Sequence, residues 1–278
     1  MRIGVSSYSF SSYIASHPNT TYTEICTIAK EIGFDGIEFV NLDAFGGVLG
    51  EASTAHAARI RTHCKEIGLD IFAYTVGADL LAQNREEQVE ATKRSIDIAH
   101  ALGAKVLRHD LTWNLPQGMS WQDAIPVMVP SVREITEYAQ QAGIRTCSEN
   151  HGFIFQNPER VKAVIDCVAH PNYGWLVDIG NFMCTDCDSL ASVRIAAPYA
   201  FHVHAKDFKK IDAGGITTPA GNHIAGTILG HGVVDIQACM DELKKAGYEG
   251  TVSLEFEGPE DPIEAIKEGY QVLSRCAK

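Results

Sequence analysis

The stretch "AKEIGFDGIEFV" at residues 29–40 decides the fold, because it joins the end of a helix to a strand through one glycine. The helical part ends at Gly33, where a left-handed backbone costs glycine little. In the strand part, Ile37 and Phe39 are apolar and Glu38 lies between them. The same unit returns four more times, as "CKEIGLDIFAY" (64–74), "AHALGAKVLRHD" (99–110), "AQQAGIRTCSEN" (139–150) and "LKKAGYEGTVSLEF" (243–256).

These repeats predict a closed (β/α)8 barrel. Two weaker units and the opening segment complete a set of eight strands, namely "NYGWLVDIGN" (172–181), "YAFHVHAKD" (199–207) and "RIGVSSY" (2–8). Alternating strands and helices imply right-handed crossovers and a parallel sheet, and eight units in 278 residues match the usual size of a TIM barrel. The strands are predicted at 2–8, 36–40, 70–76, 105–109, 144–149, 174–179, 200–206 and 251–257, and the helices at 22–33, 52–67, 85–102, 121–142, 157–169, 188–196, 235–246 and 262–275.

A single α/β domain over residues 1–278 follows, since no linker or change in composition divides the chain. The alternative is an open doubly wound sheet. Such a sheet usually carries a G-x-G-x-x-G or a P-loop after its first strand, and "IGVSSYSFSSY" (3–13) has neither. The glycine-rich segment at about 208–231 is predicted to be an inserted loop at the active-site end, which either closes over a substrate or is inert.

The composition argues against several classes of function. The formal net charge is −12 and no cluster of Lys and Arg interrupts it, so we expect no nucleic-acid partner. No apolar run approaches the roughly 20 residues of a membrane span, and the first residues lack the pattern of a signal peptide. We therefore expect a cytoplasmic protein with a small-molecule partner, and a homo-oligomer stays open. The eight cysteines are scattered and are expected to be reduced thiols, including the pair in "CTDCD" (184–188).

The stretch "AFHVHAKDF" (200–208) has polar side chains at every second position of a predicted strand. Successive side chains of a strand point to opposite faces, and the helix-facing side chains of a barrel must be apolar. The alternation therefore predicts one set facing the helices and another facing the barrel interior. The helix-facing set is Phe201, Val203 and Ala205, and the interior set is His202, His204 and Lys206.

The same rule places acidic side chains inside the barrel. Four adjacent strands each end in a side chain able to bind metal, and these are Glu149, Asp178, His204 and Glu255. A single residue of this kind is more often a solvated, capping or hydrogen-bonded group than a metal ligand, so the prediction depends on the joint placement of the four residues. Three clustered carboxylates repel one another strongly unless a cation lies between them. Oxygen donors with one imidazole favour Mn²⁺, with Mg²⁺, Co²⁺, Zn²⁺ and Fe²⁺ as alternatives.

Several motifs of the second half resemble the sugar phosphate isomerase/epimerase group of the xylose isomerase-like barrel superfamily. They are "SENHG" (148–152), "LVDIGN" (176–181), "HVHAKDF" (202–208), "GHGVVD" (230–235) and "AGYEGTVSLEFEG" (246–258). The first half resembles the group mainly through its βα rhythm and "GFDGIE" (33–38). The resemblance implies the same four metal ligands that strand parity selects.

The resemblance also implies a reaction. Members of the group are metal-dependent isomerases or epimerases of a sugar, sugar phosphate or related hydroxyketone, and proton transfer proceeds through a metal-stabilised enediolate. Here Glu149 and Glu255 would remove and return the proton beside the carbonyl. A positioned carboxylate typically accelerates such a step by about 10²–10⁴-fold.

Other residues are predicted to contact the substrate. They are His202 and Lys206 from the barrel interior, together with Tyr8, Glu38, His109, Trp113, His151, Asn181 and His231 near the mouth. Three of them have an equally simple structural reading. Lys206 would pair with a neighbouring carboxylate, His109 would support another side chain, and Trp113 would pack in a lid.

The chain departs from the ketose 3-epimerases of this group at two positions. Those enzymes have a substrate-binding histidine where Asn181 stands and an arginine where Lys210 stands. A dehydratase of the inosose or dehydroshikimate type therefore stays an alternative, because it uses the same metal and the same proton abstraction. A non-catalytic sugar-binding barrel is a further alternative. Endonuclease IV shares the superfamily, but its site needs more histidines and the negative charge of this chain opposes DNA.

Overall fold

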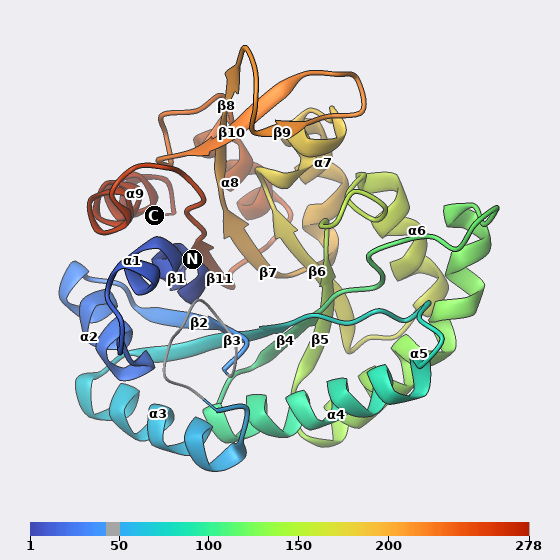
Figure 1. Cartoon of the computed structure of the whole chain (residues 1–278), viewed down its shortest axis with the longest axis horizontal. Coiled ribbons are helices and arrows are strands. Elements are labelled where there is room, and N and C mark those ends of the chain that lie inside the picture. Colours follow the sequence, from blue (N-terminus) through green and yellow to red (C-terminus); the bar gives the residue numbers. More distant parts are fainter. Residues whose placement is uncertain (43–50, 278) are drawn as a thin grey trace.

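A computed structural model describes residues 1–42 and 51–277 and confirms the predicted barrel. Eight parallel strands close in the order β1-β11-β7-β6-β5-β4-β3-β2, and helices surround them (Figure 1). The barrel strands are β1 (Arg2–Ser6), β2 (Gly36–Val40), β3 (Asp70–Val76), β4 (Val106–His109), β5 (Arg145–Glu149), β6 (Tyr173–Asp178), β7 (Ala200–Ala205) and β11 (Thr251–Leu254).

The helices of the outer layer follow the predicted positions closely. They are α2 (Tyr22–Ile32), α3 (Thr54–Ile67), α4 (Arg85–Leu102), α5 (Trp121–Gln141), α6 (Pro158–Val168), α7 (Ser189–Ala196), α8 (Ile236–Lys245) and α9 (Pro262–Cys276). A helix that the sequence did not predict, α1 (Ser11–Ser16), follows β1 after a 3-10 turn. Within residues 1–42 and 51–277, none of the helices combines the length and the apolar character that crossing a membrane requires.

The predicted helix-end glycines have left-handed backbones. Their φ angles are 116° at Gly33, 68° at Gly68, 81° at Gly103, 71° at Gly143 and 84° at Gly247. Residues with a Cβ atom are sterically strained in the left-handed region, so glycine ends these helices and lets the chain turn into the next strand.

The barrel strands separate two apolar layers. Trp175 and Val177 of β6 and Val203 of β7 belong to the main core between strands and helices, as parity predicts. A small inner cluster fills the lower barrel and consists of Ala73, Val106, Cys147 and Leu176. Phe201 departs from the prediction because it packs against this inner cluster. The register between β6 and β7 shifts at Trp175/Leu176, and such a bulge changes which face a side chain occupies.

The segment predicted as a loop at about 208–231 contains a small antiparallel sheet instead. Its strands are β8 (Asp207–Ile211), β9 (Ile216–Thr217) and β10 (His223–Thr227), in the order β8-β10-β9, and they stand at one edge of the molecule (Figure 1). Asp207 anchors the segment by accepting hydrogen bonds from the backbone N–H groups of Gly230, Gly232 and Val234. The insertion is therefore ordered by backbone pairing.

Gly226 of β10 is expected to be intolerant of any side chain. A Cβ atom there would lie 1.6 Å from the backbone oxygen of Glu257, beside the barrel mouth. Because backbone must move to relieve this overlap, Gly226→Ala is expected to lower the free energy of unfolding by about 3 kcal/mol. Gly77→Ala is the control, since its Cβ would meet no atom closer than 3.8 Å. Urea unfolding checks both variants, and equal midpoints would contradict the close approach of β10.

Candidate active site

Four side chains able to bind metal meet at the carboxyl ends of neighbouring strands. Glu149 ends β5, Asp178 ends β6, His204 lies near the end of β7, and Glu255 directly follows β11. One ligand atom of each lies within 4.8 Å of the others. The Nδ1 atom of His204 lies 3.5 Å from a Glu255 oxygen, 3.7 Å from a Glu149 oxygen and 4.0 Å from an Asp178 oxygen. The structure thus brings the four predicted residues together.

The donor atoms of this cluster fit a divalent cation. The Nδ1 atom of His204 is buried and has no hydrogen-bond partner among the described residues. Asp178 is oriented through Oδ1, which accepts hydrogen bonds from the N–H groups of Gly180 (2.8 Å) and Asn181 (3.0 Å). Its Oδ2 lies 3.4 Å from the Lys206 ammonium and has no hydrogen bond among these residues. Leaving buried polar atoms without partners costs free energy, and a shared ion would satisfy them.

The acidity of the three carboxyl groups reflects the balance between their burial and the charges beside them. Burial raises the pKa of Asp178 to about 6 against the lowering effect of Lys206, and the Glu149 and Glu255 carboxylates add to the rise. Burial also acts on Glu149, but the Arg108 guanidinium outweighs it and lowers the pKa to about 2. Burial is likewise outweighed at Glu255, whose pKa lies below its usual value because of Lys206. Both glutamates are therefore ionised at neutral pH, as a metal ligand or a general base must be.

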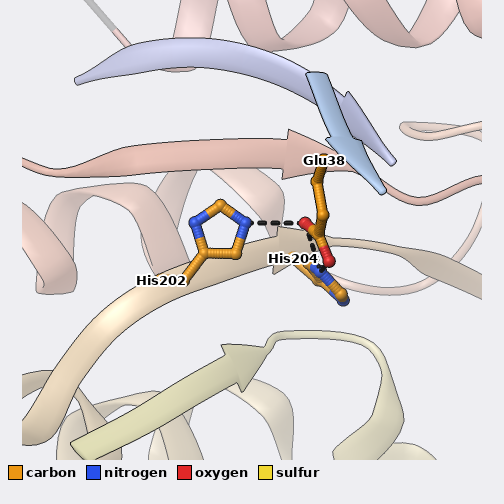
Figure 2. Close-up of side chains that lie close together, drawn as sticks. All are labelled: Glu38, His202 and His204. Carbon is orange, nitrogen blue, oxygen red and sulfur yellow. Dashed lines mark hydrogen bonds and ion pairs between the residues drawn. The ribbon is translucent and has the colours of Figure 1, made fainter. Parts of the chain in front are cut away.

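The second nitrogen of His204 is held by Glu38 (Figure 2). His204 Nε2 lies 2.9 Å from both carboxylate oxygens of Glu38, which has no exposed surface. Glu38 also contacts His202 Nε2 at 2.7 Å and accepts a hydrogen bond of 2.7 Å from the Thr75 hydroxyl. An Nε2–H donated to Glu38 leaves Nδ1 facing the three carboxylates. This carboxylate–imidazole pairing is how proteins orient a histidine that binds metal.

Glu38 and His202 were predicted to contact the substrate, but they lie beneath the site and do not line the cavity. Neither has exposed surface, and His202 is bound further by the hydroxyls of Thr251 (2.8 Å) and Ser253 (3.0 Å). Ligand atoms of Glu38, His202 and His204 also lie close enough to form a group of metal-binding type. Their separations of 2.7–2.9 Å are those of hydrogen bonds, so this group acts as a support.

Replacing Glu38 by glutamine is expected to weaken Mn²⁺ binding about 10–100-fold, because the residue that fixes a ligating imidazole contributes that much. Calorimetric titration of metal-free protein with Mn²⁺ measures the change. Thr75→Val is the matched control, since it removes one hydrogen bond to Glu38 and keeps the carboxylate. We expect the control to lose less than about 10-fold. Unchanged affinity in Glu38→Gln would show that Glu38 does not orient His204.

Two buried cations adjoin the cluster. The Nζ atom of Lys206 lies 2.6 Å from Glu255 and 3.1 Å from Glu257. Arg108 Nη2 lies 2.8 Å from Glu149 and 2.6 Å from Asp110. Each cation therefore holds one of the two candidate proton-transfer glutamates in place.

A cavity of about 480 Å³ opens above these groups, and both Glu149 and Glu255 line it. Of the residues predicted to contact a substrate, it is lined by Tyr8, Trp113, His151, Asn181 and Lys206. The Asn181 side chain donates a hydrogen bond of 2.9 Å to Glu149, and the Trp113 ring meets the His151 ring edge-on at 5.3 Å. One wall is thus aromatic and the floor is charged.

His109 and His231 lie away from this cavity. His109 has no exposed surface and shares the parity of Leu107, which packs in the main core. Its ring Nδ1 lies 2.9 Å from the Asp110 backbone oxygen. Contrary to the prediction, the side chain does not reach the mouth of the barrel. The side chain of His231 is 55% exposed and lies 3.3 Å from Glu268 of α9.

Sequence reasoning missed Arg108, Asp110 and Phe153 as lining residues. In "KVLRHD" (105–110), Arg108 stands two residues after Val106 and therefore points to the same face of the strand. Because Val106 lies in the inner cluster, this spacing is the signal that could have placed Arg108 inside the barrel. The opposite face of that strand carries Leu107 and His109, which are likewise one apolar and one polar residue. The alternation alone therefore does not show which face points into the barrel. Phe153 lies outside any strand or helix, where periodicity gives no signal.

Residues 26–276 match the family model of the xylose isomerase-like TIM barrel, and the chain belongs to that family. The resemblance drawn from the sequence motifs is therefore confirmed.

Two curated relatives and one solved structure illustrate the range of this family. The chain is 26% identical over 226 residues to an inosose dehydratase of Geobacillus thermodenitrificans, covering 75% of each protein. It is 23% identical over 278 residues to the L-ribulose-5-phosphate 3-epimerase UlaE of Shigella flexneri, covering 92% of this chain and 90% of the relative. The IOLI protein with a bound zinc atom has the same fold, with a TM-score of 0.79, 18% identity, and coverage of 100% of this chain and 98% of that chain. The two curated relatives are thus enzymes, and one is named for an inosose and the other for a sugar phosphate.

Proposed function

We propose that this protein is a divalent-metal-dependent isomerase or epimerase of a sugar, sugar phosphate or related hydroxyketone. The observation that carries the proposal is the unpartnered Nδ1 atom of His204, which faces the carboxylates of Glu149, Asp178 and Glu255 at the floor of the cavity. Such an arrangement fits a metal ion better than a purely structural network, because two buried atoms that face each other across it, His204 Nδ1 and Asp178 Oδ2, have no hydrogen bond among the described residues.

In the proposed reaction, Glu149 and Glu255 move the proton beside the substrate carbonyl. Both are ionised and line the cavity, so each can accept a proton from a bound substrate. Asn181 and Arg108 hold Glu149, and Lys206 holds Glu255, which restricts the direction in which each carboxylate presents its oxygens. A bound divalent cation would supply the positive charge that stabilises the oxygens of the resulting enediolate.

The metal would be held by Glu149, Asp178, His204 and Glu255. Three carboxylates and one imidazole form a hard donor set, which favours Mn²⁺ and also suits Mg²⁺. The zinc atom in the similar IOLI structure supports a divalent ion, and Co²⁺ or Fe²⁺ would also suit the donors. Tyr8, Trp113, His151, Asn181 and Lys206 are the proposed substrate contacts, since they line the same cavity.

Solvent exchange tests the proposal directly. Metal-loaded protein in D₂O is incubated with ketoses, ketose phosphates and ketoinositols, and proton NMR follows the position beside the carbonyl. We expect deuterium to enter this position in at least one compound. Binding without exchange across the panel would favour a non-catalytic sugar-binding barrel and refute the enzyme.

A dehydratase is the second candidate, and similarity to inosose dehydratase supports it. The same residues would abstract the same proton, and a neighbouring hydroxyl would then leave as water. Loss of water with a new enone absorbance distinguishes this outcome from epimerisation in the same panel.

A further inference from the structure

We infer that the substrate of this site is uncharged, a ketose or keto-polyol without a phosphate or carboxylate group. The inference rests on the proposed function and narrows it to one class of substrate. Its basis is the charge around the cavity, where every described lysine and arginine side chain is already paired with carboxylates.

Arg108 is not available to a substrate anion. Its side chain is 6% exposed, and Nη2 lies 2.6 Å from Asp110 and 2.8 Å from Glu149. Nη1 points to the backbone oxygen of Val76 at 3.5 Å. Since a phosphate binds arginine through two exposed N–H groups, this guanidinium would first have to leave both carboxylates.

Lys206 is surrounded in the same way. Its Nζ lies 2.6 Å from Glu255, 3.1 Å from Glu257 and 3.4 Å from Asp178, and the side chain is 6% exposed. One ammonium charge therefore faces three carboxylates, and no positive charge is left over for a ligand.

The remaining basic groups nearby do not change this balance. The Nδ1 atom of His151 lies 3.2 Å from Asp110, and Lys209, on β8, pairs with Glu260 at 3.2 Å. Residues 43–50, which lie outside the described part of the chain, read DAFGGVLG and contain no Lys, Arg or His.

The charges around the cavity sum to a negative value even with a metal ion. Five carboxylates face two cations, which leaves three negative charges, and a divalent ion leaves one. The carboxylates are Asp110, Glu149, Asp178, Glu255 and Glu257, and the cations are Arg108 and Lys206. A phosphate ester would add its own negative charge to this group, and like charges in a partly buried site repel strongly.

The other lining groups suit a neutral polyol. The Asn41 side chain offers an amide group, which pairs with hydroxyls in either direction, and the residues Trp113 and Phe153 are 45% and 49% exposed. Exposed aromatic rings beside amides provide an apolar face and hydrogen bonds without net charge.

Matched pairs of ligands test the inference. The probes are D-fructose, D-ribulose and D-xylulose, each beside its terminal phosphate ester, with scyllo-inosose as a cyclic neutral ketone. Calorimetry on Mn²⁺-loaded protein gives the affinity, and deuterium exchange is followed on the same samples. We expect the best neutral compound to bind at least about 10-fold more tightly than any phosphate ester. Inorganic phosphate is the control for direct binding to the metal.

The outcomes separate this inference from the proposed function. Tighter binding of a phosphate ester, with exchange, would overturn the neutral substrate and keep the enzyme. Preferred binding of a neutral ketone without exchange would keep the neutral ligand and refute the reaction. Binding of none of these compounds would overturn the inference.

A charge variant tests the stated cause. The Glu257 side chain is 39% exposed and pairs with Lys206 at the rim, so Glu257→Gln removes one negative charge without removing a proposed metal ligand. In each ligand pair, the ratio of the dissociation constant of the phosphate ester to that of the neutral compound is expected to fall by about 3–10-fold in this variant. Glu260→Gln, whose carboxylate pairs with Lys209, is the matched control. An unchanged preference in Glu257→Gln would overturn the electrostatic argument.

Discussion

Replacing Glu255 by glutamine is expected to lower the rate of proton exchange beside the substrate carbonyl by about 10²–10⁴-fold, the usual contribution of a general base. The amide keeps the size of the side chain but has no basic oxygen to accept the proton. Glu255 is well placed for this role, because it lines the cavity and the neighbouring Lys206 ammonium keeps its carboxyl group ionised. The measurement is deuterium uptake by the best neutral ketone at saturating Mn²⁺.

The control for this variant is Glu260→Gln, which makes the same chemical change on the same side of the barrel. Glu260 pairs with Lys209 and Thr227 and does not line the cavity. We expect its exchange rate to stay within about twofold of the unaltered protein, as for surface changes away from a site. A Glu255→Gln protein that binds Mn²⁺ fully and exchanges at the normal rate would exclude Glu255 from proton transfer.

Replacing His204 by alanine is expected to weaken Mn²⁺ binding more than about 100-fold. Losing a residue that only orients a ligand weakens metal binding about 10–100-fold, and losing the ligand itself should weaken it more. His204 provides the one imidazole of the cluster and contacts all three carboxylates within 4.0 Å. Metal analysis of protein purified without chelator should fall from about one ion per chain to near zero, with loss of exchange.

Thermal unfolding gives this variant a second readout. A ligand at 100 times its dissociation constant stabilises the folded state by about 2.7 kcal/mol, which corresponds to a rise in Tm of about 5–10 °C in a chain of this size. We expect the rise on adding Mn²⁺ in the unaltered protein and in His231→Ala, whose imidazole is exposed on the outer surface. The rise should be absent in His204→Ala. An equal rise in all three proteins would place the metal elsewhere.

The barrel could be predicted from the sequence because its signals repeat. Each glycine past a helix end and each short apolar strand marks the same unit, so one weak unit does not hide the pattern. Strand parity then selected three of the four clustered residues, since Asp178, His204 and Glu255 each stand between apolar neighbours that must face the helices. Neither face of the strand before Glu149 is clearly apolar, so this residue was selected by its place at the strand end. The inserted sheet of β8, β9 and β10 was expected as a loop, because its glycines obscure the alternation of short strands.

Parity was less reliable where the alternation or the register breaks. A bulge at Trp175/Leu176 places Phe201 against the inner cluster. On β4, Arg108 occupies the interior position and His109 packs outward, although a histidine near a strand end looks more like a site residue. An arginine inside a barrel requires buried carboxylate partners, and these come from distant parts of the chain that a local pattern does not show.

The support of His204 by Glu38, and of Asp178 by two backbone amides, comes entirely from the polypeptide. The coordinating atoms are consequently preorganised by folding alone. An ion bound at the proposed site could arrive after the barrel has closed, depart when supply falls, and return without any rebuilding of the chain. Catalytic capacity would then follow the supply of metal on the time scale of ligand exchange, independently of protein synthesis.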